Sequence, residues 1–166
     1  MTPRVSVVVP THARPQLVRR AVDSALAQSL AEIEVIVVVD GHDPATLDVL
    51  RAIDDRRVRV HVEAVAGGQA AAINHGVRRA RAPWTALLDD DDEWRPRKLE
   101  TQLAVAEASP HASPVVGCRF VARSASGDAL WPLRAPRAGE RVCDYLFCRT
   151  RTTSTSAAHP RRSRAA

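Results

Sequence analysis

The sequence predicts an α/β fold in which helices cover a mostly parallel sheet. Apolar, β-branched runs of strand length alternate along the chain with longer segments whose apolar residues recur at helical spacing. Parallel strands need crossover helices, so this order indicates successive βαβ units. The 166 residues fit one domain, and a hydrophobic content of 45% supplies enough apolar surface for one core.

In the first half of the chain, two buried strands alternate with two helices. Residues 4–10 form a β-branched run that ends at proline, and residues 34–40 form a second run that ends at Asp-Gly. Such continuous apolar runs are typical of parallel strands covered on both faces. Residues 14–30 place apolar side chains at helical spacing with arginines opposite, and Pro15 suits a first helical turn. Residues 44–54 predict a shorter helix.

The second half continues the same alternation. Residues 57–64 alternate strictly, with valines on one face, which predicts a third strand nearer an edge. Residues 67–81 read as a glycine turn followed by a helix, and residues 84–89 as a fourth strand. Residues 95–110 predict a helix that stops at proline, and residues 113–123 a fifth strand.

Polar side chains follow three of the predicted strands. Thr11 and His12 follow the first strand, Asp40 follows the second, and a run of aspartates beginning at Asp89 follows the fourth. In open parallel sheets, ligands bind outside the carboxyl ends of the strands. We therefore expect these side chains to converge on one site.

The aspartate run is the strongest candidate for a metal site. In an extended segment Asp89 and Asp91 would share one face, and Asp90 and Asp92 the other. Two carboxylates on one face suit Mg²⁺ or Mn²⁺, which complete their coordination with water and substrate phosphates. The competing interpretation is a solvated acidic loop that caps the helix starting near Pro96.

The other candidates carry weaker signals. Asp40 precedes a glycine, which is ordinary turn chemistry, but at a strand end it could accept a hydrogen bond from a nucleobase or a ribose. Residues 67–76 are rich in glycine yet lack the spacing of a P-loop or of a dinucleotide site. Their small side chains would let the helix pack tightly and bring Asn74 near a ligand. Arg14 is either a phosphate contact or a plain loop residue.

The charge distribution argues against a nucleic-acid partner. The segment after Cys148 holds five arginines and no acidic residue. Removing those five from the 24 basic residues leaves 19, equal to the 19 acidic residues, so the net charge of +5 belongs to this tail. A nucleic-acid-binding domain needs a basic face on its folded part. We predict a domain over residues 1–148 and a disordered basic tail over residues 149–166.

Cysteine usage and hydropathy place the chain in the cytoplasm. The three cysteines are odd in number and form no CxxC pair, which favours reduced thiols over disulfides or a zinc site. No stretch reaches the roughly 18 apolar residues of a membrane helix, and the start lacks an apolar signal segment. We therefore expect a soluble cytoplasmic protein.

Four quoted segments resemble the family 2 glycosyltransferases. They are VSVVVPTHARP, AVDSALAQSL, EVIVVVDGHDP and GGQAAAINHGVRRARAPWTALLDDDDEWRPRKLETQL. The resemblance covers roughly residues 4–125 and agrees with the family in the order and spacing of its motifs.

This resemblance implies a GT-A fold with a Rossmann-like half that binds a nucleotide-diphospho-sugar. The family's D-x-D motif corresponds to Asp89-Asp90-Asp91, which implies Asp91, with Asp89, as ligands of Mg²⁺ or Mn²⁺ on the donor diphosphate. Asp89 or Asp90 would face the ribose. The implied donor-binding residues are Pro10, Thr11, Arg14, Asp40, Asn74, Asp89 and Asp90.

The sequence also departs from the family pattern. Val39 stands where an aspartate is common, Ile73 replaces a common arginine, and His12 with Ala13 replaces Tyr-Asn. The family inverts the anomeric centre, with a carboxylate base in a later acidic motif, and no position here matches that motif. Asp144 is the last carboxylate. We therefore expect a donor-binding half that lacks its remainder, by truncation or a shifted reading frame, and is catalytically impaired.

Several properties stay open at the level of sequence. The acceptor, a glycan or another hydroxyl compound, is not readable, and the catalytic residues are unknown. Apolar surface left by a missing half is compatible with oligomers and with peripheral membrane association. A nucleotidyltransferase-like nucleotide binder is an alternative, although the first strand-to-helix loop lacks glycine. A non-enzymatic nucleic-acid binder acting through the arginine-rich tail is another.

Overall fold

The computed structural model describes residues 2–131, 137, 139–140 and 158–160. The chain divides into two compact units. The first unit comprises residues 1–116 and 156–166, and the second comprises residues 117–155. All predicted site residues belong to the first unit.

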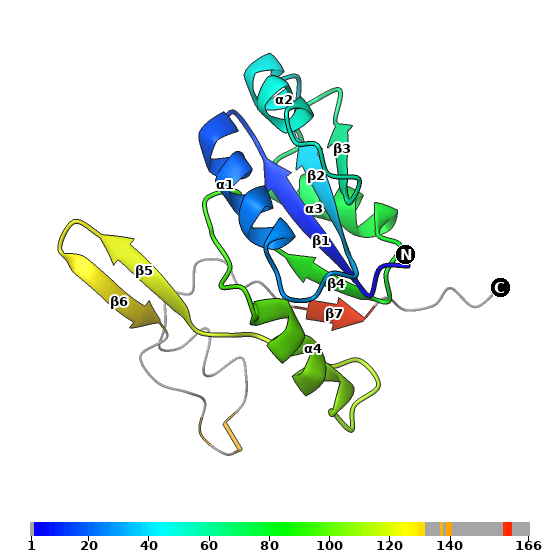
Figure 1. The fold of residues 1–166 in the computed structure, drawn as a ribbon, viewed down its shortest axis with the longest axis vertical. Helices are drawn as coiled ribbons and strands as arrows, with labels where there is room; N and C mark the ends of the chain where they lie inside the picture. Colours follow the sequence, from blue (N-terminus) through cyan, green and yellow to red (C-terminus); the bar gives the residue numbers. More distant parts are fainter. Residues whose placement is uncertain (1, 132–136, 138, 141–157, 161–166) are drawn as a thin grey trace. The chain divides into compact units, whose positions relative to one another are not determined.

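The first unit is built on a sheet whose four main strands are parallel (Figure 1). The strands are β1 (Val5–Thr11), β2 (Ile33–Val39), β3 (Val58–Val62) and β4 (Trp84–Leu87), in the spatial order β3-β2-β1-β4. A fifth strand, β7 (Ala158–Pro160), pairs antiparallel with β4. Because β1 lies between β2 and β4, the carboxyl ends of strands far apart in sequence become neighbours.

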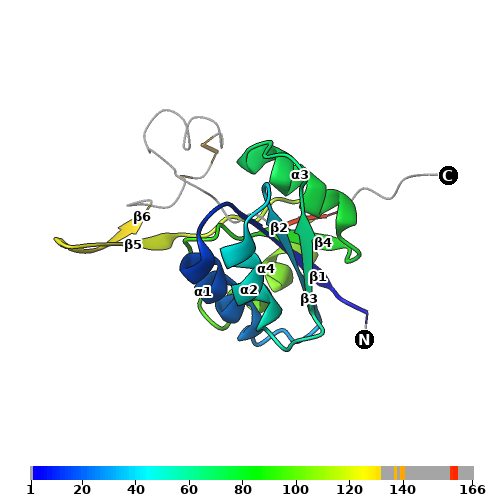
Figure 2. The same ribbon diagram turned by 90° about the horizontal axis from the view of Figure 1, so that it is seen from above.

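Helices cover both faces of this sheet (Figure 2). One face carries α1 (Pro15–Leu26), α2 (Pro44–Arg51) and α4 (Lys98–Glu107), and the other carries α3 (Gln69–Arg79). The buried cores reflect this division. The larger core joins α1, α2 and α4 to alternate residues of β1 and β2. The smaller core joins Ala72 of α3 to the other side of β2. The predicted three-layer α/β architecture is confirmed.

The helix α3 approaches the sheet closely because it carries a glycine at the point of contact. Gly76 is buried, and a Cβ atom added to it would lie 2.3 Å from Cγ1 of Val8 and 3.3 Å from Cγ2 of Val38. Any larger side chain would push the helix away from β1 and β2. The small residues of this segment therefore serve tight helix-to-sheet packing.

The helix α1 ends earlier than the sequence predicts, at Leu26 rather than residue 30. The buried side chain of Gln28 explains the difference. Its Nε2 donates to the carbonyl oxygen of Arg95 at 2.8 Å, and its Oε1 accepts from the backbone N–H of Leu99 at 3.0 Å. Gln28 thus ties the end of α1 to the start of α4 and fixes the loop that follows β4.

The prediction of a fifth strand over residues 113–123 is correct only in part. The structure forms β5 (Phe120–Ser124) in the second unit, where it pairs antiparallel with β6 (Gly127–Trp131) as a separate two-stranded sheet. Gly127 has a φ of +119°, which glycine tolerates, at the turn between the two strands. A local hairpin therefore replaces the predicted addition to the parallel sheet.

The predicted limit between residues 148 and 149 lies outside the described residues, as do Cys143 and Cys148. Within the predicted tail, Ala158–Pro160 form β7. Cys118 is an exposed free thiol. Among the helices that the structure describes, none combines the length and the apolar character needed to cross a bilayer.

Candidate functional site

The carboxyl ends of β1, β2 and β4 bring the predicted residues to one edge of the sheet. Thr11 is the last residue of β1, Asp40 follows β2 directly, and Asp89 lies two residues beyond β4. The backbone continues the sheet pattern here, since Asp40 N–H donates to the Thr11 carbonyl and Leu88 N–H donates to the Val8 carbonyl. The parallel topology therefore gathers these residues, as predicted.

Asp90 is the buried centre of this cluster. Its side chain accepts a hydrogen bond at Oδ2 from the Thr11 hydroxyl at 2.8 Å and at Oδ1 from Arg14 Nη1 at 3.0 Å. A carboxylate withdrawn from water is stable only when paired and hydrogen-bonded. The hydroxyl from β1 and the guanidinium from the start of α1 meet that requirement. Asp90 therefore locks the loop after β4 onto β1.

The backbone of the aspartate run is a turn rather than an extended segment. Asp92 N–H donates to the Asp89 carbonyl at 3.1 Å, which places Asp90 and Asp91 at the centre of the turn. The predicted alternation of faces is therefore wrong. Asp91 Oδ2 shares Arg14 Nη1 with Asp90, at 3.2 Å, whereas Asp89 Oδ1 accepts from Gln69 Nε2 at 3.0 Å. The turn points Asp89 and Asp91 to different partners.

Arginines of α1 and of the loop before it form ion pairs that reduce the repulsion among these carboxylates. Arg14 bridges Asp90 and Asp91, and the hydrogen bond that Arg14 donates to Asp90, together with the charges of both carboxylates, raises the pKa of Arg14 above its ordinary value. Arg20 forms an ion pair with Glu93, the next acid along the run. Sequence reasoning missed this pairing. The available signal was the set of arginines on the predicted helix over residues 14–30.

Asp40 organises the glycine turn before α3. Its Oδ1 accepts from Gly67 N–H at 2.7 Å and its Oδ2 from Gly68 N–H at 2.8 Å. Gly68 adopts a φ of +84°, a left-handed conformation that favours glycine. The carbonyl oxygen of Asp40 also lies 2.6 Å from His12 Nδ1. Sequence reasoning missed this role, for which the pair of glycines was the available signal.

Two predicted residues lie apart from these hydrogen bonds. Pro10 is buried within β1, in register with Val38 of β2, and shapes the strand end without a side-chain polar group. Asn74 is exposed on α3, and its side chain makes no hydrogen bond to the part of the chain that the structure describes. The structure thus joins Thr11 and Arg14 to Asp90, and Arg14 also to Asp91, whereas Asn74 takes no part in these hydrogen bonds.

The residues fit a divalent cation that is shared with a phosphate ligand. Within the described ranges, no group of three or more His, Cys, Asp or Glu side chains could hold a metal ion alone. Ions such as Mg²⁺ commonly need just one or two carboxylates, because phosphates and water complete the shell. Asp91 is suited to this role because its side chain is 54% exposed, whereas Asp90 is buried and its oxygens are engaged.

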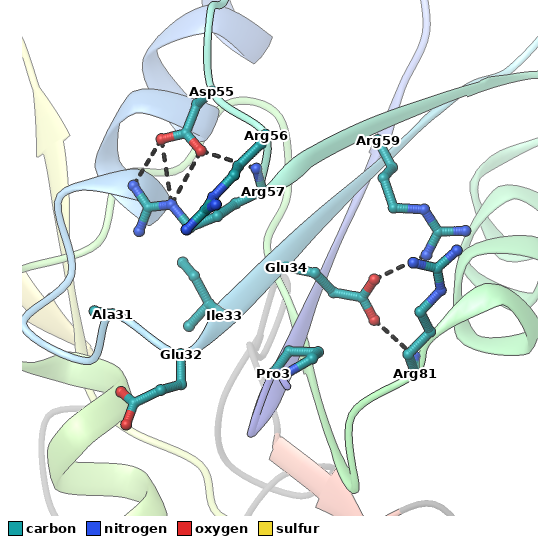
Figure 3. Close-up of a pocket in the computed structure, with 10 residues that line it drawn as sticks. All are labelled: Pro3, Ala31, Glu32, Ile33, Glu34, Asp55, Arg56, Arg57, Arg59 and Arg81. Atoms are coloured by element: carbon teal, nitrogen blue, oxygen red, sulfur yellow. Dashed lines mark hydrogen bonds and ion pairs between the residues drawn. The ribbon is translucent and has the colours of Figure 1, made fainter. Parts of the chain in front are cut away.

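A cavity of about 490 Å³ lies at the opposite, amino-terminal edge of the sheet (Figure 3). Glu34 at its wall accepts hydrogen bonds from Ser6 Oγ at 2.6 Å, Arg81 N–H at 2.7 Å and Arg59 Nη1 at 2.8 Å. Burial opposes ionisation, but these hydrogen bonds outweigh it and hold the pKa of Glu34 below its usual value. Glu34 pairs with Arg59 here and Asp55 pairs with Arg57, so we do not place the functional site in this cavity.

The fold defines the class of the protein. Solved glycosyltransferases of the GT-A type have the same fold. A mannosyltransferase from Pyrobaculum calidifontis, solved with GDP-Man and Mn²⁺, matches 71% of this chain and 36% of its own, with a TM-score of 0.61 and 26% identity. The S. aureus protein TarS, solved with UDP-GlcNAc, matches 69% of this chain and 33% of its own, with a TM-score of 0.57 and 25% identity.

The sequence comparison narrows the class to one family. The family described as Glycosyl transferase family 2 matches residues 6–158, and the chain belongs to it. The succinoglycan biosynthesis protein ExoO of Rhizobium meliloti is 38% identical over 107 residues, 64% of this chain and 31% of its own length. An uncharacterized glycosyltransferase of Rickettsia typhi is 30% identical over 119 residues, 72% of this chain. The chain spans about a third of the length of these relatives.

Proposed function

We propose that this chain binds a nucleotide-diphospho-sugar through Mg²⁺ or Mn²⁺, as the donor-binding part of a family 2 glycosyltransferase. The observation that carries the proposal is the turn at Asp90 and Asp91, which Thr11 and Arg14 anchor at the carboxyl edge of the sheet. The related mannosyltransferase was solved with GDP-Man and Mn²⁺, which supports a donor and an ion of this kind.

Each residue of the edge has a distinct part in this proposal. We assign Asp91, exposed at the turn, to the ion together with Asp89, whose carboxylate would have to leave Gln69. In this proposal Thr11 and Asp40 contact the nucleobase and Arg14 contacts the phosphates, and Asn74, exposed on α3, completes the donor-binding set. Asp90 keeps the turn in place, and the proposal puts the ribose beside it. When bound, the ion neutralises the charge that develops on the leaving diphosphate.

Transfer itself requires a base for the acceptor hydroxyl. In the proposed inverting reaction this base removes the hydroxyl proton as the oxygen attacks the anomeric carbon and the nucleoside diphosphate leaves. Among the carboxylates of the described edge, Asp90 and Asp40 are engaged by hydrogen bonds, and this proposal assigns Asp91 and Asp89 to the ion. We therefore propose that this chain binds donor in the cytoplasm but does not transfer sugar by itself.

The proposal is tested by calorimetry and thermal unfolding of the whole chain. UDP-, GDP- and dTDP-sugars are titrated with Mn²⁺, with Mg²⁺ and with EDTA. We expect one donor class to raise Tm in the presence of metal, and we expect Asp91→Asn to remove that increase. Asp48→Asn is the matched control, because Asp48 is an exposed aspartate on α2 that pairs with Arg51. The absence of metal-dependent binding for all three donors would overturn the proposal.

A second assay addresses transfer. Hydrolysis of the bound donor and transfer to simple hydroxyl acceptors are followed with Mn²⁺ present. We expect neither reaction to exceed the rate without protein. Turnover that disappears in Asp91→Asn would show that the chain contains its own base, and would refute its inactivity while leaving the metal site intact.

A further inference from the structure

The guanidinium of Arg14 occupies the acidic turn that is proposed to hold the metal ion. Its Nη1 atom lies 3.0 Å from Asp90 Oδ1 and 3.2 Å from Asp91 Oδ2. One arginine nitrogen therefore serves both carboxylates at the centre of the turn. A divalent cation at Asp91 would take up the same negative charge, so the two positive groups compete for it.

The two ion pairs of Arg14 differ in how firmly they hold. Arg14 and Asp91 are 51% and 54% exposed, and ion pairs between exposed groups contribute little because water replaces them readily. Asp90 is only 8% exposed, so loss of its arginine would leave a buried charge poorly compensated. The contact to Asp91 is therefore the one that can break.

The backbone around Arg14 is held in place while its side chain is exposed. The Arg14 carbonyl accepts from Val18 N–H at 3.0 Å in the first turn of α1. The preceding residue, Ala13, donates its N–H to Asp43 Oδ2 at 3.1 Å. The Asp43 side chain also caps α2 through Thr46 N–H, so the loop is anchored to a second helix. A change of partner at Arg14 thus needs only side-chain rotation.

We propose that Arg14 is an internal counter-ion of the acidic turn, which releases Asp91 to a divalent cation while it keeps Asp90. This inference rests on the proposed donor-binding function and adds a regulatory role for a residue of the same site. In the free chain Arg14 limits repulsion between adjacent carboxylates. On binding, the guanidinium stays beside the turn, close to where the donor phosphates would lie.

An alternative role for Arg14 predicts the opposite result. If Arg14 merely stiffens the turn, its removal loosens the position of Asp91 and weakens metal binding. If Arg14 competes with the ion, its removal strengthens metal binding, because a positive charge about one ion-pair distance away no longer opposes the cation. The direction of the change in Mn²⁺ affinity therefore separates the two roles.

The test measures binding of Mn²⁺ alone to the full chain by electron paramagnetic resonance or calorimetry. We expect Arg14→Gln to bind Mn²⁺ about tenfold more tightly than the natural protein, since one nearby unit charge is removed. Arg14→Lys keeps the charge and should stay close to the natural protein. Arg20→Gln is the matched control, because Arg20 pairs with Glu93 beside the turn and its removal changes net charge equally. Its affinity should change less than twofold.

Unchanged or weaker Mn²⁺ binding by Arg14→Gln, with binding by the natural protein abolished in Asp91→Asn, would overturn the counter-ion role and leave the donor-site proposal standing. Absence of Mn²⁺ binding in both the natural protein and Arg14→Gln would overturn the counter-ion role, whereas the titrations of donor with Mn²⁺ decide the donor-site proposal separately.

If Arg14→Gln does not fold, nuclear magnetic resonance of the natural protein can test the counter-ion role instead. The ¹⁵N signals of the arginine side chains are followed in the natural protein during titration with diamagnetic Mg²⁺, and the Arg14 signal is assigned by its absence in Arg14→Lys. We expect the Arg14 signal to shift while the signal of Arg57, which pairs with Asp55, stays fixed. An Arg14 signal that does not move as Mg²⁺ saturates the site would contradict the proposal.

Discussion

The two edges of the same sheet bury an acidic side chain in almost the same way, yet they differ in what surrounds it. The side chain of Glu34 at the amino edge is 7% exposed, and that of Asp90 at the carboxyl edge is 8% exposed. Each accepts a hydrogen bond from a hydroxyl of β1, Ser6 or Thr11, and each pairs with an arginine. Burial and pairing alone therefore do not distinguish a structural carboxylate from a functional one.

The difference lies in the neighbours of the arginine. Arg59 is 26% exposed and its carboxylate partner is Glu34, which also accepts the backbone N–H of Arg81. Arg14 is about twice as exposed and divides its contacts between buried Asp90 and exposed Asp91. The amino edge is therefore a closed network, whereas the carboxyl edge holds one carboxylate that can change partner.

The largest effect on stability is expected for Glu34→Ala. The substitution leaves Ser6, Arg59 and the Arg81 N–H without their shared acceptor. We expect the free energy of unfolding to fall by about 3 kcal/mol, because removing one member of a buried ion pair leaves the charge of the other uncompensated. Chemical denaturation of the whole chain measures it. Glu32→Ala, on the same rim, is the control and should change stability little; equal losses would show that the network is not closed.

A smaller loss is expected for Asp90→Ala at the carboxyl edge. The substitution removes the acceptor of the buried Thr11 hydroxyl. Arg14 is half exposed, so its guanidinium can hydrogen-bond to water and keep its ion pair with Asp91. We expect a loss of about 2 kcal/mol, in the range for hydrogen bonds to a charged partner. Denaturation under the same conditions makes the comparison direct. A loss larger than that of Glu34→Ala would reverse the contrast drawn between the edges.

The sequence predicts the arrangement of this sheet better than the contacts made at its edges. The four parallel strands and their helices follow from periodicity and composition, because a strand buried on both faces must be apolar throughout. The convergence of Thr11, Asp40 and the aspartates follows from parallel topology. The partners of Asp90 do not, because Arg14 lies 76 residues away and meets it only since β1 inserts between β2 and β4.

Two errors of sequence interpretation have local causes. The sequence pattern suggests an extended aspartate run, but the hydrogen bond from Asp92 N–H to the Asp89 carbonyl closes a turn that four identical side chains do not indicate. The pattern of residues 113–123 predicts a strand of the main sheet, but Gly127 allows the chain to fold back and pair β5 with β6. A strand pattern does not tell which partner a strand will take.

Acidification should reduce the contribution of Glu34 to the free energy of unfolding. The pKa of Glu34 in the folded chain lies below its ordinary value, so the stabilisation it gives is complete above the unfolded-state pKa and is lost as pH falls through the folded-state pKa. The difference in unfolding free energy between the natural protein and Glu34→Gln should therefore shrink from neutral pH toward pH values of about 3. Denaturation series at several pH values measure it; a difference that grows on acidification would contradict the assigned direction.

The smallest effect is expected for Asp91→Asn in the absence of ligand. Asp91 and Arg14 are each about half exposed, so solvent replaces their ion pair at little cost, and Arg14 keeps Asp90. We expect the free energy of unfolding to change by less than about 0.5 kcal/mol. The change can even be favourable, because it removes repulsion between adjacent carboxylates. A loss comparable to that of Asp90→Ala, measured by denaturation without metal, would make Asp91 a structural residue like Glu34 and would remove the distinction on which the candidate site depends.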